Sequence, residues 1–357
     1  MTMNKMECLQ PVLYLAALSL AGCSGDGSNG GAVVDRRQMT AVVPTASIDA
    51  PEMSRGNSLS GPVSGDAFPA GTDDIFAVTD YRSTDKPTSN PAFDYGVAYF
   101  HNQAVSIDAG NKISFNTPQF YPVTGNLYFY AYSPVMSTAP SPSDDGYRQG
   151  STGTAPMVTF DIGKGNVDIL WARHDDGIAR AATSTTQQHP RFDFSHRLQQ
   201  VRIRLVRGVD FPPGWKVGAI YVKGNPRDDK DDANKLKDKA TLNLLDGSVA
   251  YASKIDNFTH ELKSPNLWDI TTPVETNFLI RPIQRLSLTF MVDTDPSNPG
   301  QHTRTYSADV TLANTQTDVG GRSYLLTATF GGGIDVKVQM AGNGSWNSCT
   351  LKKQTIR

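Results

Sequence analysis

Residues 192–206 read FDFSHRLQQVRIRLV, and residues 201–205 within this stretch alternate strictly between two kinds of side chain. Val201, Ile203 and Leu205 are apolar, and arginines stand between them. In a β-strand a period of two puts each kind on its own face, whereas a helix would scatter the arginines around its circumference. The stretch therefore predicts a strand with one face in a core and an arginine-bearing face toward solvent.

Short apolar or alternating runs recur along the chain of 357 residues, separated by many of its 31 glycines and 22 prolines. Further strands are expected over residues 75–80, 93–101, 112–116, 127–132, 157–162, 167–172, 215–222, 240–245, 248–253, 277–280, 285–292, 303–310, 323–330 and 334–340. Many short strands with turn residues between them are typical of an all-β protein. Each half offers a similar set, so we predict two β-sandwiches in series that meet near Gly208.

The N-terminus carries a short apolar run that ends at a cysteine. Residues 12–18 (VLYLAAL) are followed by Ser19 and then by Leu-Ala-Gly-Cys, which ends at Cys23. The run is shorter than the roughly 20 apolar residues of a membrane-spanning helix. It is similar to a bacterial lipoprotein signal, which implies cleavage before Cys23 and acylation of its thiol. The alternative is an ordinary signal peptide that contains a cysteine. The following residues 24–31 (SGDGSNGG) hold no large apolar side chain and are expected to be a flexible tether.

Charge and cysteine content narrow the classes of function. The formal net charge is −2, and no basic stripe is visible, which argues against a nucleic-acid partner. Of the three cysteines, Cys8 lies in the signal and Cys23 is the acylation candidate. Only Cys349 remains, so the mature chain cannot form an internal disulfide and must be stabilised by its apolar core.

Four stretches, one of them within residues 192–206, follow one another in a characteristic order. They are residues 120–134 (FYPVTGNLYFYAYSP), 168–172 (DILWA), 194–205 (FSHRLQQVRIRL), and 321–324 (GRSY) with the later Trp346. Together, after a lipoprotein signal, they resemble the fimbrillin family, the type V pilins and their relatives in Bacteroidales. The resemblance covers nearly the whole chain from Cys23 onward.

The resemblance implies a fold, a maturation route and a set of partners. Such pilins are exported as lipoproteins and carry two tandem transthyretin-like, Ig-like β-sandwich domains. An arginine-specific protease cuts a loop after the first strand, and removal of that strand opens a groove. A C-terminal donor strand of another subunit fills the groove, and an adhesive fimbria grows outside the outer membrane. For this chain it implies other fimbrial subunits, the protease, the outer membrane through the lipid anchor, and host surface ligands as partners, without a cofactor.

The removable first strand would be residues 40–48 (TAVVPTASI), whose internal proline restricts it to the edge of a sheet. The loop that follows, 49–73, is rich in Pro, Gly and Ser. It contains Arg55 followed by Gly56, our candidate cleavage site, in a protease-accessible setting. A cut at Arg36 or Arg37 would leave the first strand attached. The alternative is that Arg55 is an ordinary loop arginine and that the subunit keeps its first strand.

The donor strand is expected in residues 334–340 (IDVKVQM), which alternate over their whole length. The residues that would enter the groove are Ile334, Val336, Val338 and Met340. The alternative makes this stretch the last strand of the second sandwich. The predicted division is a signal peptide over 1–22, a tether with the removable strand over 23–55, an N-terminal sandwich over 56–207, and a C-terminal sandwich with the donor tail over 208–357.

No constellation of side chains indicates catalysis or metal binding. Ser195 and His196 are adjacent on an expected strand, where neighbours point to opposite faces, so they cannot act as nucleophile and base. The run 174–176 (HDD) is expected to be a solvated loop, because three consecutive residues rarely converge on one ion. The run 228–232 (DDKDD) lacks the glycine and the final glutamate of an EF-hand calcium loop and is also expected to be solvated. The aromatic stretch 120–132 is expected to place one face in the core and to pair aromatic side chains between strands on the other, rather than to form a sugar-stacking surface.

We therefore predict a structural fimbrial subunit that is not an enzyme. The alternative function is a non-polymerising surface lipoprotein that binds a glycan or a host protein.

Overall fold

The computed structural model describes residues 39–48, 68, 70–83, 87, 93–224, 235–254, 257–261, 269–270, 274–295, 297, 303–312, 321–331, 333–341 and 353–355. Apart from one short 3-10 turn at Ser184–Thr186, all regular structure in these residues is β-strand, which confirms the all-β prediction. Within the same residues, no helix has the length and apolar character needed to cross a membrane.

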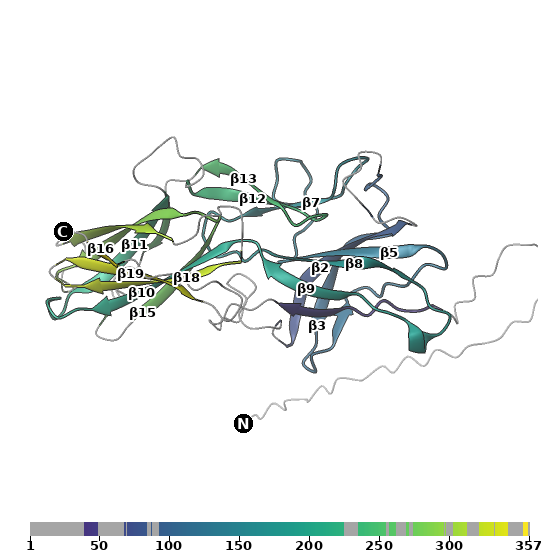
Figure 1. Cartoon of the computed structure of the whole chain (residues 1–357), viewed down its shortest axis with the longest axis horizontal. Helices are drawn as coiled ribbons and strands as arrows, with labels where there is room; N and C mark the ends of the chain where they lie inside the picture. Colours follow the sequence, from purple (N-terminus) through teal and green to yellow (C-terminus); the bar gives the residue numbers. More distant parts are fainter. Residues whose placement is uncertain are drawn as a thin grey trace, which may run out of the picture. The chain divides into compact units, whose positions relative to one another are not determined.

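A seven-stranded sheet occupies the first half of the described chain (Figure 1). Its strands, in spatial order, are β1 (Thr45–Ile48), β9 (Arg191–His196), β8 (Leu170–Ala179), β5 (Asn126–Ser133), β2 (Thr72–Ser83), β3 (Phe100–Ile107) and β4 (Ile113–Phe115). Neighbours run antiparallel except β1 and β9, which run parallel. β1 is thus an edge strand with an unusual direction.

The two faces of this sheet line two different cores. The phenylalanine core lies on one face and includes Phe68, Phe76, Phe100, Phe115, Phe129, Phe192 and Phe194. The tyrosine core lies on the other and includes Tyr81, Tyr95, Tyr128, Tyr130, Tyr132 and Tyr147. Along β5, Phe129 belongs to the first core while Tyr128 and Tyr130 belong to the second. This alternation confirms the predicted assignment of the tyrosines and the apolar residues to opposite faces. Both faces are buried, whereas only one core face was expected.

A four-stranded sheet covers the tyrosine core. Its strands are β13 (Val249–Lys254), β12 (Lys237–Asn243), β7 (Met157–Asp161) and β6 (Gly146–Arg148). Val158, Phe160, Ala240 and Leu242 point into the tyrosine core, so the residues between them face away from it.

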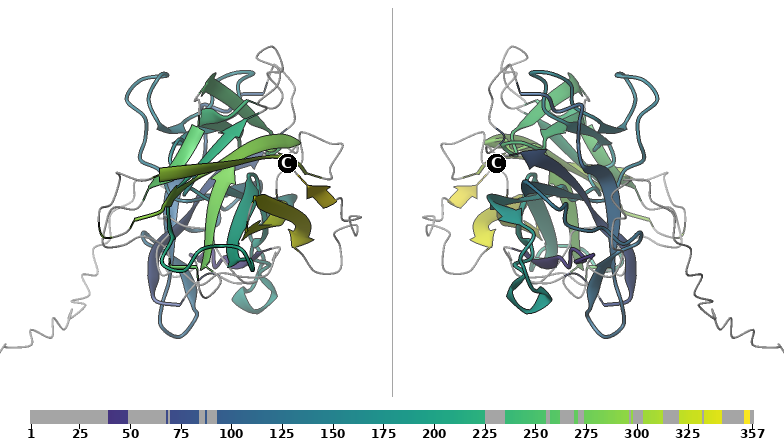
Figure 2. Two further views of the ribbon diagram at one scale, coloured as in Figure 1. Left: turned by 90° about the vertical axis from the view of Figure 1, so that its left-hand side faces the viewer. Right: turned by 90° about the vertical axis from the view of Figure 1, so that its right-hand side faces the viewer.

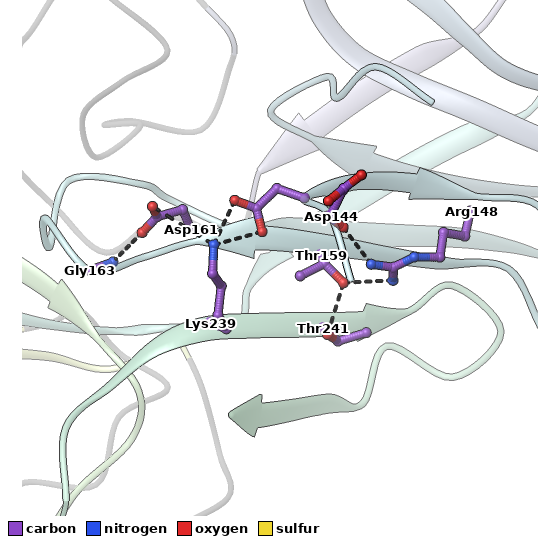
Figure 3. A network of polar contacts seen from close by, with 8 residues as sticks. Asp144, Arg148, Thr159, Asp161, Gly163, Lys239 and Thr241 are labelled. Atoms are coloured by element: carbon purple, nitrogen blue, oxygen red, sulfur yellow. Dashed lines mark hydrogen bonds and ion pairs between the residues drawn. The ribbon is translucent and has the colours of Figure 1, made fainter. Parts of the chain in front are cut away.

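The face turned away from the tyrosine core carries a polar network, drawn in Figure 3. The ammonium of Lys239 on β12 lies 2.7 Å from a carboxylate oxygen of Asp145 and 3.9 Å from one of Asp161, so it bridges two segments. The hydrogen bond to Asp145 raises the pKa of Lys239. Beside it, Arg148 donates to the Thr159 hydroxyl over 2.8 Å. These contacts join β12 to β7 and to the loop before β6.

The C-terminal strands form a two-layered sandwich. One layer is β15 (Val274–Ile280), β10 (Gln199–Arg207), β18 (Ser323–Phe330), β19 (Ile334–Ala341) and β20 (Lys353–Thr355). The other is β14 (Asn257–Glu261), β11 (Lys216–Gly224), β16 (Arg285–Asp293) and β17 (Thr303–Thr311). Apolar residues of both layers share one cluster, the sandwich core. Figure 2 shows the short β20 beside β19 at one edge of its layer.

The alternation that predicted β10 is confirmed in detail. Val201, Ile203 and Leu205 are fully buried in the sandwich core. The intervening Arg202 and Arg204 lie on the other face, where both form ion pairs with Glu275 of the neighbouring strand β15. The arginine-bearing face is therefore a charge-paired surface.

The predicted boundary near Gly208 does not match the strand pairing. β10 precedes it in sequence, yet β10 pairs with β15 and β18 of the C-terminal sandwich. β12 and β13 follow it, yet β12 pairs with β7 and both lie in the sheet over the tyrosine core. Gly208 itself donates its N–H to the Phe330 carbonyl over 2.6 Å, and a Cβ at this position would collide with that oxygen. Strand pairs therefore cross the predicted division at 207/208, because periodicity identifies strands without identifying their partners.

Candidate strand-exchange site

The first described segment, residues 39–48, lies along the edge of the phenylalanine core. Its second half is β1, which pairs parallel with β9 in a register that joins Thr45 to Arg191 and Ile48 to Phe194. The N–H of Thr45 donates to the Pro190 carbonyl over 3.0 Å at the start of this ladder. Four residue pairs therefore hold β1 to the sheet, and no other strand pairs with β1 among the described residues.

The first half of the segment has a different partner. The Val42 N–H donates to the Gln119 carbonyl over 2.8 Å, and the Tyr121 N–H donates to the Thr40 carbonyl over 2.9 Å. These bonds surround an antiparallel bridge between Ala41 and Phe120. The segment is thus held between residues 119–121 on one side and β9 on the other.

Pro44 lies where the segment changes partner. Because proline has no N–H, it would leave a gap inside a regular ladder, but at this crossing point no ladder bond is lost. The preceding N–H, that of Val43, donates to Nδ1 of His189 over 3.2 Å. The edge position predicted for this proline-containing strand is confirmed.

Alternate residues of the segment seal the core. Val42 is 5 % exposed and Ile48 is 4 % exposed, and both belong to the phenylalanine core. Pro44 is buried and Ala46 packs against the same cluster, so the four inward positions are 42, 44, 46 and 48. At about 1.5–3 kcal/mol for each large buried side chain, the Val42 and Ile48 side chains contribute about 3–6 kcal/mol together.

The outward face of β1 is tied to β9 by a polar contact. The Ser47 hydroxyl donates to a carboxylate oxygen of Asp193, its partner in the ladder. Arg191 donates to the same oxygen through Nε over 3.0 Å. These hydrogen bonds, that of Ser47 above all, lower the pKa of Asp193 below its usual value. The carboxylate form therefore favours the docked segment.

The two walls of the site, residues 119–121 and the chain that leads into β9, are also held by hydrogen bonds that do not involve the segment between them. Tyr121 is buried, and its hydroxyl donates to the Gln188 carbonyl over 2.8 Å. The Gln187 side chain accepts from the Ala181 N–H over 2.8 Å and donates to the Ala179 carbonyl over 3.1 Å. None of these bonds involves residues 39–48, so the two walls are held together independently of the segment between them.

The chain re-enters the same core soon after the segment ends. Phe68 is buried in the phenylalanine core, with ring centroids 5.6 Å from Phe76 and 5.3 Å from Phe194. Ile48 also packs in this core, so both ends of the stretch 49–67 are anchored in one cluster. The candidate cleavage residues Arg55 and Gly56 fall within that stretch and lie outside the described residues, as does Cys23.

The candidate donor strand lies inside the C-terminal sandwich. β19 pairs antiparallel with β18 over eight residues, from Ser323 opposite Ala341 to Phe330 opposite Ile334. On its other side β19 pairs with β20 over three residues. Ile334 is buried in the sandwich core. In this structure, therefore, the stretch is a strand of the C-terminal sandwich, as the alternative interpretation expects.

The serine and histidine that stand side by side in the sequence serve different contacts. Ser195 donates its hydroxyl to the Trp171 carbonyl over 3.3 Å. His196 Nδ1 lies 2.9 Å from a carboxylate oxygen of Asp168, and both side chains are buried. The two side chains thus form no nucleophile–base pair, as strand geometry predicted.

The acidic runs give no metal centre in the described structure. The HDD run lies within β8 and not in the expected loop, and His174 contacts the Arg191 carbonyl at 3.4 Å. Among the residues that the structure describes, no three or more His, Cys, Asp and Glu side chains gather to hold a metal ion. The run 228–232 lies outside those residues.

Comparison with known proteins identifies the family to which this chain belongs. A sequence model of the fimbrillin-like family matches residues 63–344. The chain belongs to that family. Its membership makes it a fimbrial or adhesion-related surface protein, and the family consists of structural proteins. No curated protein matches the chain.

Two solved structures are similar to this chain, and the first of them shares its fold. One is a protein of Bacteroides uniformis assigned to cell adhesion, with 15% identity and a TM-score of 0.50, covering 85% of this chain and 98% of that one. Another is a fimbrial protein of Bacteroides vulgatus, with 15% identity and a TM-score of 0.49, covering 85% of this chain and 99% of that one. The resemblance drawn from the sequence motifs is confirmed at the level of the family.

Proposed function

We propose that this fimbrillin-like protein is a structural subunit of a cell-surface fimbria that assembles by strand exchange. The observation that carries the proposal is the segment 39–48, which ends in the short edge strand β1 and seals the phenylalanine core with alternating side chains. If the segment left, the edge of β9 and the core beneath it would be exposed to water, which is unfavourable and adhesive. A strand from another subunit would satisfy the same backbone groups and fill the same positions, the β-augmentation mode of binding.

The maturation route follows from the order of residues along the chain. We propose that the protein is exported as a lipoprotein acylated at Cys23 and is then cut by an arginine-specific protease between Arg55 and Gly56. The cut falls between Ile48 and Phe68, so it separates the first strand covalently from the rest of the core. Phe68 would stay with the mature chain. In this proposal the precursor is an outer-membrane lipoprotein and the product is part of an extracellular fimbria.

For the donor we propose the C-terminal stretch with Ile334, Val336, Val338 and Met340. Its apolar residues have the same spacing of two as the inward positions 42, 44, 46 and 48. Donation requires β19 to leave its eight-residue pairing with β18. Because β20 covers the other edge of β19, release of β20 would come first.

Limited proteolysis tests this function. The purified precursor is treated with a limiting dose of an arginine-specific protease, the new N-terminus is sequenced, and the oligomeric state is measured by size-exclusion chromatography with light scattering. We expect cleavage after Arg55, followed by a ladder of oligomers. Arg55→Ala should stop both, whereas the matched change of Arg36 and Arg37 to Ala should stop neither.

Two results would count against the proposal. Resistance at Arg55 would overturn the maturation route and leave a subunit that keeps its first strand. Cleavage that yields only monomers, even when a peptide of residues 334–340 is added, would favour the non-polymerising surface lipoprotein.

A further inference from the structure

The surface of the seven-stranded sheet has a hollow at one end of its central strands. A pocket of about 560 Å³ is lined by Arg82 and Ser83 at the end of β2, by residues 97–99 before β3, and by Thr124 and Gly125 before β5. Because β2 lies between β3 and β5 and runs antiparallel to both, these three chain segments meet at one end of the sheet. The pocket is separate from residues 39–48 and their walls.

Apolar side chains concentrate around this pocket. Val97 is 72 % exposed, Tyr99 is 43 % exposed, and Val123, next to the lining residue Thr124, is 74 % exposed. These are three of the six large hydrophobic residues that are exposed in the described part of the chain. Single exposed apolar residues are normal, but several that gather at one hollow indicate a binding surface.

A fixed cation stands at the rim of this apolar surface. The Nε of Arg82 donates to the Thr124 carbonyl over 2.7 Å, and Nη2 donates to the Thr124 hydroxyl. Gly125 has φ of +87°, and a Cβ there would lie 3.2 Å from the Arg82 side chain, so glycine allows the turn to approach the arginine. A guanidinium carries five N–H donors, and Thr124 takes two of them. Within the described residues Arg82 forms no ion pair.

The combination indicates the chemistry of the ligand. An exposed tyrosine ring with aliphatic neighbours suits the flat C–H face of a pyranose ring, and a guanidinium suits a carboxylate. The volume lies within the range of small-molecule sites. A protein partner would need roughly 800 Å² of contact on this side, far more than three exposed side chains provide. We propose that this pocket binds a carboxylated sugar, such as a uronic or sialic acid residue of a glycan.

Direct titration of the uncleaved full-length protein tests the site. Glucuronic acid and N-acetylneuraminic acid are compared with glucose by ligand-observed NMR and isothermal titration calorimetry. We expect the acidic sugars to bind in the millimolar range and glucose to bind about 10- to 100-fold more weakly, since it lacks the charge-assisted hydrogen bonds. Because the protein is not cleaved, the result does not depend on strand exchange.

Variants separate the two parts of the site. Arg82→Gln should remove the preference for acidic sugars, and Tyr99→Ser should weaken the binding of all the sugars. Val209→Ser, at a fully exposed valine elsewhere, and Arg204→Gln, on β10, are the matched controls and should bind as the unchanged protein does. Should Arg82→Gln disturb the turn at Thr124, Tyr99→Ser still decides the outcome.

Three results would overturn the inference. The first is equal affinity for glucose and glucuronic acid. The second is absence of binding by every sugar at concentrations about 50-fold above the expected millimolar dissociation constant. The third is sugar binding that neither Arg82→Gln nor Tyr99→Ser changes.

Discussion

Ile48→Ala should loosen the first strand much more than it disturbs the rest of the fold. Ile48 is 4 % exposed, lies in the phenylalanine core and occupies the last position of the β1–β9 ladder. Truncation of a buried isoleucine to alanine typically costs about 2–5 kcal/mol, and an edge strand belongs toward the lower end of that range because its surroundings can relax. A loss of about 2–3 kcal/mol corresponds to about a 30- to 150-fold increase in the opening equilibrium of the segment.

Amide hydrogen exchange of the uncleaved protein measures this opening directly. The Thr45 N–H, which donates to the Pro190 carbonyl, reports whether β1 is docked. We expect its protection factor to fall by about 30- to 150-fold in Ile48→Ala, while amides of β16 in the C-terminal sandwich keep theirs. Val43→Ala, at an exposed position of the same segment, is the control and should change protection little. Equal loss of protection in both variants would refute the claim that the inward residues hold the segment.

Three further outcomes follow from the contacts of the described residues. The pKa of Asp193 is lowered in the folded protein, so its contribution to docking of β1 is fully present above about pH 3.8, the usual value, and is lost as the pH falls below it. Hydrogen exchange of the Thr45 amide should therefore become faster, relative to its intrinsic rate, between pH 5 and pH 2.5. In Asp193→Asn this pH dependence should be smaller. Phe68→Ala should lower the free energy of unfolding by about 3–5 kcal/mol in denaturant titration, since its ring packs between Phe76 and Phe194; a loss near zero would exclude it from the core. His196→Ala should cost about 3–5 kcal/mol because it leaves the buried Asp168 without this partner, yet cleavage at Arg55 should proceed at the normal rate.

Local periodicity predicted the all-β class and the faces of several strands, but it was less accurate for their bounds. The strand expected over 93–101 begins only at Phe100, and the stretch 192–206 forms two strands, β9 and β10, which belong to different sheets. The alternation of Val201, Ile203 and Leu205 predicted the buried face of β10. On β5 the alternation of tyrosines with apolar residues was predicted correctly, but both faces are buried in cores, whereas only one core face was expected. Such patterns are local, because the direction of a side chain depends only on the position along its own strand. The expected edge position of the first strand also came from a single local fact, the presence of a proline.

The partners of each strand could not be obtained in the same way. β10 belongs with β15 and β18, whereas β12 belongs with β7, so the strands cross the boundary that an even division of the chain predicted. Pairing depends on long-range fit between faces, and two strands with the same alternation are indistinguishable from their sequence alone. The same limit left the donor interpretation open, since the pairing of β19 with β18 is a tertiary fact.

The walls of the candidate site were also missed. Tyr121 was recognised as an aromatic of a family motif, but its backbone contact with Thr40 and its hydroxyl contact with Gln188 join residues far apart in sequence. His189 likewise gives no local signal, because its contact with Val43 depends on the crossing point at Pro44. A single exposed Tyr99 in a loop could not be told from the many aromatics of the core until burial was known.

A disulfide lock tests the central claim, that release of the first strand is required for assembly, most directly. Ser47 and Asp193 face each other in the β1–β9 ladder, so Ser47→Cys with Asp193→Cys, in a Cys349→Ser background, should allow a disulfide between the strands. We predict that the oxidised protein is still cleaved after Arg55 but stays monomeric, and that reduction restores oligomers. Oligomers that form at the same rate with the lock closed would contradict the account.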